Sequence, residues 1–325
     1  MWYWIGRDVQ WLMHFVVLGG AAGVMLLCST LTAAQGLPRY ELSLGADYRL
    51  AEFDWSIAGE LNGTAPNVLS ELTWTDLEIP QVSAAARVNF GRHVVLQANG
   101  AYGEIISGKN QDSDYAGENR SSEFSRSNNA GRGRIDEASL ALGYRFRVYD
   151  SLAGRYAHIT PLAGYSLHHQ NLKIKDGVQT IPATGPLADL SSTYDAQWQG
   201  PWLGLNMRLE AGERTALLVD MAYHWADYSA EADWNLRDDL AHPVSYRHAA
   251  TGEGVIAALG VVHALSRHWE VVARIESQHW TTDPGVDTVY LIDAGSGAVS
   301  AVTTRLNAVH WKSRLLGITA IYRFM

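Results

Sequence analysis

The sequence has almost no cysteine and only one long hydrophobic run. Its single cysteine, Cys28, lies inside that run, so the remainder of the 325-residue chain contains no thiols and can form no disulfides. After residue 35 no apolar run approaches the roughly 18 residues that a membrane-spanning helix requires. If this chain crosses a membrane, it therefore crosses with β-strands, whose backbone groups are all paired once the sheet closes on itself.

Motifs of several common chemistries are also missing. The chain has no Gly-x-Ser-x-Gly, no phosphate-binding loop and no Cys-x-x-Cys, and its net charge of -9 gives no support for nucleic-acid binding. His168 and His169 are adjacent, and adjacent residues on a strand point to opposite faces, which argues against a shared metal ion. We therefore expect no metal, no cofactor and no nucleic-acid partner.

The hydrophobic run lies at the start of the chain. Phe15 to Leu31 is apolar and uncharged, follows Arg7, and leads into Thr32-Ala33-Ala34. Small residues at the third and first positions before Gln35 are typical of a signal-peptide cleavage site. We expect residues 1–34 to be a signal peptide and residues 35–325 to form the mature domain. The alternative is an uncleaved membrane anchor over residues 11–31, which could just span a bilayer.

After this segment the apolar residues alternate with a period of two, which predicts β-strands. In the first strand, for example, Tyr40, Leu42 and Leu44 share one face. The predicted strands cover residues 40–48, 72–90, 94–102, 140–148, 159–167, 202–209, 217–225, 254–264, 269–279 and 306–324. Their number is ten, which is even, as a bacterial single-chain barrel requires.

The predicted connections alternate between short and long. Short turns are expected at 91–92, 149–155, 211–213 and 266–267, and long polar connections at 52–70, 107–135, 172–196, 228–250 and 281–303. Outer-membrane barrels have this pattern, with short turns and both termini in the periplasm and long loops outside the cell. We therefore predict an all-β, transmembrane, antiparallel up-and-down barrel with surface-exposed loops.

Aromatic usage agrees with a membrane barrel. Trp (12) and Tyr (15) greatly outnumber Phe (6), and these amphipathic rings prefer the membrane–water interface. The C-terminal residues 317–325 alternate and end in Phe324-Met325, which resembles the terminal strand signal that the barrel assembly machinery reads. Both features favour insertion into the bacterial outer membrane.

Four short motifs occur in order along the predicted strands: Ser70-Glu71-Leu72-Thr73-Trp74, Asp112-Ser113-Asp114-Tyr115, Ala163-Gly164-Tyr165 and Pro201-Trp202-Leu203-Gly204-Leu205. With these motifs, nearly the whole chain after residue 40 resembles the omptins, which are ten-stranded outer-membrane endopeptidases. The resemblance implies an aspartate-type peptidase in which a water molecule is held between an aspartate pair and an Asp–His pair.

The resemblance places the first pair at Asp112 and Asp114. Two aspartates two residues apart on an extended segment project to the same face, so they could hold a water together at the barrel mouth. Crowding would raise the pKa of one of them and leave a shared proton. As a motif without the family, the same segment is typical of a solvated loop.

The second pair departs from the family pattern. Matching Asp233 to the family's aspartate puts Asn235 where the histidine is expected. An amide cannot accept a proton from water at neutral pH, so the general base is missing unless His242 or His248 folds back into the site. A shifted match that pairs Ala232 with Trp234 does not restore a histidine.

The resemblance also places Glu52 and Glu231 near the acids that select a basic substrate side chain, although both are also ordinary rim carboxylates. Outer-membrane lipid and lipopolysaccharide are expected partners, and arginines of the second loop could contact lipopolysaccharide phosphates; these are Arg120, Arg126, Arg132 and Arg134. Three functions remain open: an omptin-like endopeptidase, a catalytically silent barrel whose loops bind a surface partner, and a small pore, which is least favoured because ten strands leave a narrow interior.

Overall fold

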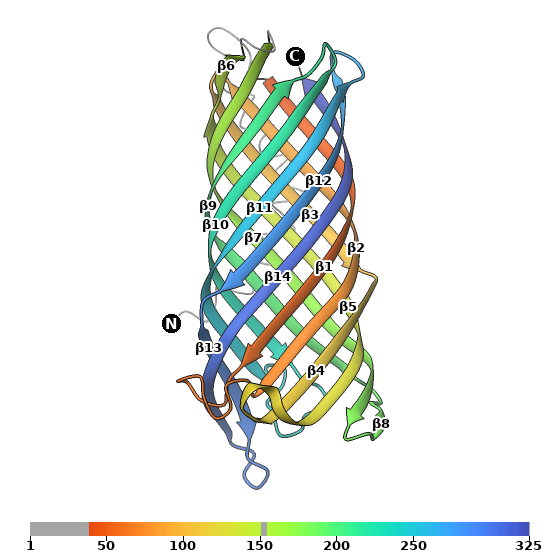
Figure 1. Cartoon of the computed structure of the whole chain (residues 1–325), viewed down its shortest axis with the longest axis vertical. Helices are drawn as coiled ribbons and strands as arrows, with labels where there is room; N and C mark the ends of the chain where they lie inside the picture. Colours follow the sequence, from red (N-terminus) through yellow and green to blue (C-terminus); the bar gives the residue numbers. More distant parts are fainter. Residues whose placement is uncertain (1–38, 151–154, 325) are drawn as a thin grey trace.

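The computed structural model describes residues 39–150 and 155–324. The predicted signal peptide and its cleavage site lie outside the described residues. Within that range the chain is a closed antiparallel barrel (Figure 1), apart from one short 3-10 turn, η1 (Glu118–Arg120). None of the helical structure in the described residues is long and apolar enough to cross a bilayer.

The described residues contain fourteen strand segments. In chain order they are β1 (Arg39–Ile57), β2 (Ser70–Phe90), β3 (Val94–Ile105), β4 (Ser107–Gly117), β5 (Ser121–Tyr144), β6 (Phe146–Asp150), β7 (Arg155–Ile181), β8 (Gly185–Pro186), β9 (Ser191–Glu210), β10 (Thr215–Asp233), β11 (Tyr246–Ala264), β12 (Trp269–Thr282), β13 (Gly285–Ile292) and β14 (Val299–Phe324).

These segments form ten strands of the barrel wall, as the sequence predicts. β3 and β4 continue one another between β2 and β5, β5 and β6 both pair with β7, and β12 and β13 both lie between β11 and β14. β8 is a two-residue segment that pairs with β7 alone. β1 pairs with both β2 and β14, which closes the barrel.

The strands are longer than the sequence predicts. Most residues of the five expected long connections are strand, and the connections that remain are 58–69, 118–120, 182–190, 234–245 and 293–298. In β4 and the first half of β5 the prediction failed because polar residues lie on both faces and leave no apolar alternation. In β1, β9 and β10 the alternation continues beyond the lipid-facing zone with its apolar face turned inward, as for Phe53 and Trp55, and the predicted strands end too early. The short turns at 91–93, 211–214 and 265–268 lie where they were predicted, and the fourth falls partly outside the described residues.

The lipid-facing zone lies toward the end of the barrel where both described termini meet, which we call the terminal end; the opposite end is the loop end. Large exposed apolar side chains cover this zone, among them Leu44, Leu140, Leu203 and Leu316. Exposed aromatic residues border it on both sides: Tyr48, Tyr102, Tyr165, Tyr223 and Trp225 toward the loop end, and Tyr144, Phe146, Trp269 and Phe324 toward the terminal end. This is the pattern of an apolar belt between two aromatic girdles.

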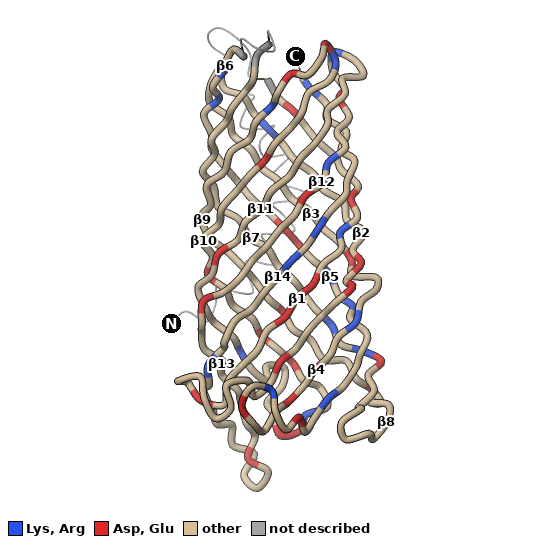
Figure 2. Tube along the Cα trace, viewed as in Figure 1, with Lys and Arg blue, Asp and Glu red and all other residues tan. Residues whose placement is uncertain are grey.

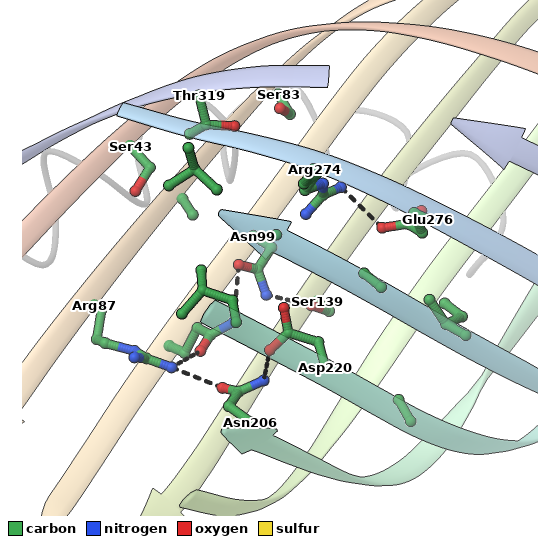
Figure 3. Close-up of a pocket in the computed structure, with 18 of the residues that line it drawn as sticks. Ser43, Ser83, Arg87, Asn99, Ser139, Asn206, Asp220, Arg274, Glu276 and Thr319 are labelled. Atoms are coloured by element: carbon green, nitrogen blue, oxygen red, sulfur yellow. Dashed lines mark hydrogen bonds and ion pairs between the residues drawn. The ribbon is translucent and has the colours of Figure 1, made fainter. Parts of the chain in front are cut away.

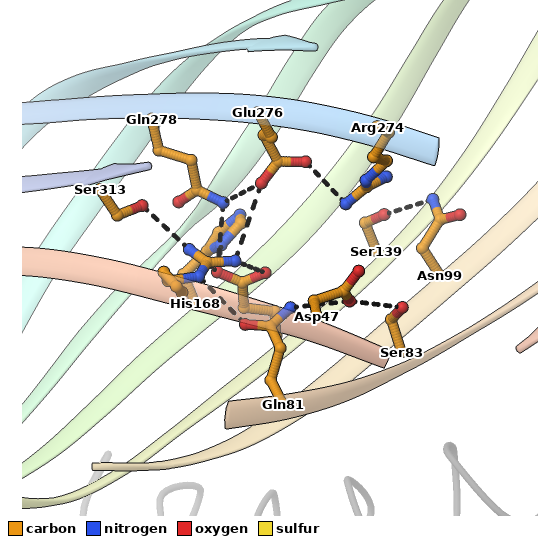
Figure 4. A network of polar contacts seen from close by, with 12 residues as sticks. Asp47, Gln81, Ser83, Asn99, Ser139, His168, Arg274, Glu276, Gln278 and Ser313 are labelled. Atoms are coloured by element: carbon orange, nitrogen blue, oxygen red, sulfur yellow. Dashed lines mark hydrogen bonds and ion pairs between the residues drawn. The ribbon is translucent and has the colours of Figure 1, made fainter. Parts of the chain in front are cut away.

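Charged residues occur along the whole wall (Figure 2). Several of them are buried inside the barrel, among them Asp47, Arg49 and Glu270. The central one is Arg49, which is fully buried and lies 3.0 Å from Glu137 and 3.7 Å from Glu276. Its guanidinium also donates to Gln81 (3.0 Å) and Ser313 (3.2 Å), in the network drawn in Figure 4. Alternation along the strands thus keeps this charge out of lipid and pairs it inside the barrel.

Toward the loop end a layer of aromatic side chains fills the bore. The ring of Phe53 on β1 lies 5.7 Å from that of Tyr194 on β9, and the ring of Trp55 lies 5.9 Å from the same tyrosine. β1 and β9 stand on opposite sides of the ten-stranded wall. Buried rings from five further wall strands join this layer: Trp74, Tyr228, Tyr246, Trp280 and Trp311.

Because rings from opposite walls are in contact, the barrel should not conduct ions. Wild-type protein reconstituted in planar bilayers is expected to give no steps above the background current. Double replacement of Trp198 and Trp280 by alanine, which removes two buried rings of this layer, is the control that opens space in the bore. Frequent discrete openings of the wild-type protein would show that the layer is not a seal.

Candidate functional site

The predicted aspartate pair lies inside the barrel mouth at the loop end. β4 carries both residues: Asp112 is paired in register with Leu72 on β2 and Asp114 with Ser70. Leu72 is fully buried in the interior, so the side chains that share its face point inward. The prediction that Asp112 and Asp114 project to the same side of an extended segment is therefore confirmed.

Burial and mutual repulsion act on this pair. Burial, and secondarily the neighbouring charge of Asp114, raises the pKa of Asp112 from its ordinary value of 3.8 to about 8. Burial also raises the pKa of Asp114, against the opposing effect of hydrogen bonds from Ser70 and Ser125. At neutral pH the pair therefore holds a proton, for which burial is the main cause and the crowding expected from the sequence a smaller one.

The connection between β10 and β11, residues 234–245, supplies the groups that face the pair. The indole Nε1 of Trp234 donates to Asp112 Oδ2 at 3.4 Å. The Arg237 guanidinium is bonded to Asp239 (2.7 Å), and its charge partly opposes the rise in the pKa of both Asp112 and Asp114. Neither group can accept a proton from water at neutral pH, because an indole N–H only donates and a guanidinium stays protonated.

This connection is held by hydrogen bonds of its own. The Trp234 backbone N–H donates to Ser245 Oγ (2.9 Å), the Ser245 hydroxyl donates to the Ala241 carbonyl (3.1 Å), and the Arg237 N–H donates to the Trp234 carbonyl (2.9 Å). Trp234 also packs edge-on against Tyr246, with ring centroids 4.9 Å apart. The indole is thus positioned over the acidic pair by both backbone and ring contacts.

Tyr246 forms part of the floor of the mouth. Its side chain is buried, and its hydroxyl has no hydrogen-bond partner among the described residues. Burial, followed by the charge of Asp112, raises the pKa of this hydroxyl well above its usual range. Beneath it, Tyr194 bonds Tyr228 and His248 Nδ1, both at 2.7 Å, so His248 is engaged in the floor and does not reach the acidic pair.

Asn235, which the omptin resemblance places at the histidine position, does not face the aspartates. Its Oδ1 accepts from the Ser191 N–H (2.8 Å) and the Ser192 hydroxyl (3.1 Å), and its Nδ2 donates to the Asp189 carbonyl (2.8 Å). These contacts tie the β10–β11 connection to the start of β9. Asn235 therefore has a structural role at the rim.

Asp233 does meet a histidine, but not inside the mouth. His242 Nδ1 lies 2.5 Å from Asp233 Oδ1, and this hydrogen bond raises the pKa of His242. Ala230 and Ala232 are buried on the inward face of β10, so alternation puts Asp233 on the outward face. The Asp233–His242 pair is consequently at the outer rim, whereas Asp112 and Asp114 point into the bore.

The two predicted selectivity acids also point outward. Glu52 is exposed between buried Ala51 and Phe53, and its cross-strand neighbour on β14 is Lys312. Glu231 is exposed and forms an ion pair with Arg247, with a separation of 2.8 Å. The structure brings neither glutamate to the mouth. On β1 the odd-numbered residues face the bore and on β10 the even-numbered ones do, so Glu52 and Glu231 both point away from it.

Sequence reasoning missed the residues that do face the pair, namely Trp234, Arg237 and Tyr246. The signal for Trp234 was available, since the inward alternation of Ala230 and Ala232 continues to it. Arg237 lies in an irregular connection, for which no periodic pattern exists.

His168 and His169 lie on opposite faces of β7. His168 is buried among Trp280 and His224 inside the barrel, whereas His169 is bonded on the outer side to Asp136 (3.2 Å) and to Asp195. Over residues 39–150 and 155–324 no group of three or more His, Cys, Asp or Glu is arranged to hold a metal ion.

A hollow of about 470 Å³ lies in the terminal half of the bore (Figure 3). Its wall combines hydroxyl, amide and charged groups, and Arg87 Nη2 donates to Gln97 (2.8 Å) and Asn206 (2.7 Å). Acidic and basic side chains alternate around it, including Arg274 and Glu276, which pair at 2.8 Å.

The closed wall and the apolar belt with its two girdles define an outer-membrane β-barrel. The family model of the Protochlamydia outer membrane protein (Pom) matches residues 43–324. The chain belongs to that family, and its place is the bacterial outer membrane.

Among solved structures, the outer membrane protease OmpT from Escherichia coli is similar, with a TM-score of 0.69 and 13% identity over 88% of this chain and 96% of that chain. At this identity the likeness shows the fold alone. The translocator domain of the autotransporter NalP from Neisseria meningitidis matches with a TM-score of 0.37 and 12% identity over 95% of this chain and 96% of that chain. No curated protein gives a significant match.

Proposed function

We propose that this barrel is a binding protein whose mouth accepts a basic side chain of a partner molecule at the cell surface. The observation that carries the proposal is the identity of the groups facing Asp112 and Asp114. They are the Trp234 indole, which donates to Asp112, and the Arg237 guanidinium, which acts through its charge; within residues 39–150 and 155–324 no histidine is bonded to either aspartate.

Peptide hydrolysis at this pair would need a base to take a proton from the attacking water. Trp234 cannot serve because its ring nitrogen only donates, and Arg237 cannot because its guanidinium does not give up its proton in proteins. An acidic pair beside aromatic rings is, however, a suitable receptor for a guanidinium or ammonium group. Arg237 of the chain itself already exerts the field of such a cation on the two carboxyl groups.

Binding of a cation at this site should release a proton. Because the pKa of Asp112 is about 8, the pair keeps a proton at pH 7 in the absence of ligand. An arriving positive charge favours the ionised form and drives that proton off. The affinity should therefore rise with pH between about 6 and 8 and level off above the pKa.

The site is accessible to a surface partner if the loop end faces outside the cell, and we propose this orientation with both termini in the periplasm. The long hairpins of the loop end and the short turns of the terminal end support it. An epitope tag inserted at the η1 turn should be reached by antibody on intact cells, and a tag at Gly91 should not.

Contact with lipopolysaccharide is proposed for Arg132 in particular. Three of the four arginines named for that role are engaged with carboxylates in the barrel: Arg120 with Glu71 (2.7 Å), Arg126 with Glu123 (2.5 Å) and Arg134 with Asp136 (3.5 Å). Within the part of the chain that the structure describes, Arg132 donates only to the neighbouring Gly131 carbonyl, at 2.9 Å.

The binding proposal is tested with a fluorescent peptide that contains two consecutive arginines, titrated with purified barrel in detergent micelles at pH 6, 7 and 8. Saturable binding that tightens by about 50-fold from pH 6 to 8 is expected, because the ionised fraction falls about tenfold for each pH unit below the pKa and is one half at the pKa itself. The double variant Asp112→Asn, Asp114→Asn should lose peptide binding. The control variant Asp238→Asn, which removes one exposed carboxylate of the β10–β11 connection, should bind the peptide like the wild type. Equal affinity of all three proteins would refute the site.

A peptidase is the second candidate, and the hydrogen bond between Asp233 and His242 is the observation in its favour. An aspartate that orients an imidazole is the usual arrangement of a general base. If this pair cuts peptides with Asp112 and Asp114, His242→Ala should reduce cleavage of a dibasic peptide by about 10²–10⁴. A cleavage rate equal to that of buffer for the wild-type protein eliminates this candidate.

A further inference from the structure

The hairpin of β13 and β14 extends past the rest of the wall at the loop end (Figure 1). β1 pairs with β14 only as far as Ile57, which lies opposite Leu306. Beyond that point, Val299 to Arg305 pair with β13 alone. On its other side this part of β14 has no strand neighbour among the described residues, so Val299–Thr303 is an open edge of the sheet.

Backbone N–H and C=O groups of this edge point away from β13, in the plane of the sheet. The Ala58 N–H donates to the Arg305 carbonyl at 2.9 Å, so the Arg305 backbone faces the side of β1. Alternate residues of an antiparallel strand direct their N–H and C=O to the same side, which places those of Ala301 and Thr303 on the open side. Within residues 39–150 and 155–324 no hydrogen bond involving these groups is found on that side.

This edge carries none of the usual protection against pairing. Natural edges are guarded by charged side chains, proline or a bulge. Residues 294–304 contain no charge and no proline, and β14 is paired with β13 in unbroken register. Val299 is 59% exposed and Val302 46% exposed.

The opposite edge of the same hairpin is closed by the chain itself. The Ala241 N–H donates to the Tyr290 carbonyl (2.8 Å), the Tyr290 N–H to the Ser245 carbonyl (2.9 Å) and the Ile292 N–H to the Asp239 carbonyl (2.9 Å). The molecule therefore covers the β13 edge with its own β10–β11 connection and leaves the β14 edge free.

We propose that Val299–Thr303 is a docking edge for an extended, uncharged segment of another protein, which adds to β14 as a further strand. Unpaired backbone groups in a row select a strand, and main-chain hydrogen bonds supply its affinity. Because residues 294–304 carry no charge, a charged segment would find no opposite charge at this edge, and main-chain pairing alone favours a neutral segment of high strand propensity.

A second copy in the same membrane is a poor occupant. Antiparallel pairing of one edge with itself requires a twofold axis perpendicular to the sheet. The sheet here is the barrel wall, so that axis lies in the membrane plane and would point the two barrels in opposite directions. The occupant is thus a segment of a different chain. This inference is independent of the acidic mouth.

The test uses the full-length barrel in detergent micelles and a fluorescein-labelled peptide with the uncharged sequence of residues 298–304, measured by anisotropy. Saturable binding is expected, with a loss of at least tenfold when alternate peptide nitrogens are methylated, since methylation removes donors without changing the side chains. Ala301→Pro removes the N–H on the open side and should abolish binding, as should Ala301→Lys, which places a charge on the edge.

Ala294→Lys adds the same charge in the adjoining turn and should bind the peptide like the wild type. Circular dichroism and heat-modifiable migration on gels report whether each variant is folded. Equal binding by wild type and both Ala301 variants, or equal binding of the methylated peptide, overturns the proposal. Concentration-dependent dimers of the barrel that disappear in Ala301→Pro would overturn the choice of occupant.

Discussion

Replacing Arg49 with methionine should lower the free energy of unfolding by about 3–5 kcal/mol, because removing one partner leaves buried charge uncompensated. Arg49 is fully buried and faces Glu137 at 3.0 Å and Glu276 at 3.7 Å. Gln81 and Ser313 would lose their shared hydrogen-bond donor at the same time. Urea unfolding of the refolded protein in lipid vesicles measures the difference.

The control is a triple variant that adds Glu137→Gln and Glu276→Gln to Arg49→Met. With the charges removed on both sides, most of the lost stability should return, since replacing a whole buried ion pair is often close to neutral. A loss of less than 1 kcal/mol for Arg49→Met alone would show that water enters this part of the bore and screens the carboxylates.

The second large effect is expected at the mouth, with the opposite sign. At pH 7 Asp112 is protonated in the folded state, where its pKa is about 8, but ionised in the unfolded state. Holding the proton costs the folded state about 1.4 kcal/mol for each pH unit above the unfolded pKa. Asp112→Asn removes this cost and should raise the free energy of unfolding by about 4 kcal/mol at pH 7. An asparagine oxygen can still accept the Trp234 N–H.

The pH dependence follows from the direction of this shift. The folded state holds the proton more tightly than the unfolded state, so the wild-type protein loses stability as the pH rises from about 4 to about 8. The gain from Asp112→Asn should therefore vanish near pH 4 and reach its full size above pH 8. Unfolding curves of both proteins at pH 4, 6, 7 and 9 measure it, and a gain that does not change with pH would contradict the raised pKa.

Within the lipid-facing belt, the sequence predicts the wall well. There one face must be apolar, so residues such as Leu42 and Leu44 mark the strand, and the number of wall strands is correct. At the loop end β4 and the first half of β5 have polar residues on both faces. Pairing there depends on backbone hydrogen bonds alone, which leave no trace in the pattern of apolar residues.

In the candidate site, too, one half follows from the sequence pattern and the other half does not. The shared face of Asp112 and Asp114 follows from their spacing on an extended segment. The second half of the site was sought at Asp233 and Asn235 by likeness to the omptins, but alternation along β10 turns Asp233 outward and carries Trp234 inward. The alternation of Ala230 and Ala232 is therefore a better guide to which side chains face the bore than the match of Asp233 and Asn235 to the omptin motif.

We propose that the acidic pair binds cations and does not cut peptides. The most direct test follows both outcomes in one sample: a diarginine peptide is incubated with the wild-type barrel at pH 8, its bound fraction is read by anisotropy, and its mass is then determined. We predict saturable binding that requires Asp112 and Asp114, with the peptide mass unchanged after prolonged incubation. Peptide fragments that form with the wild-type protein and not with the Asp112→Ala, Asp114→Ala variant would contradict the account.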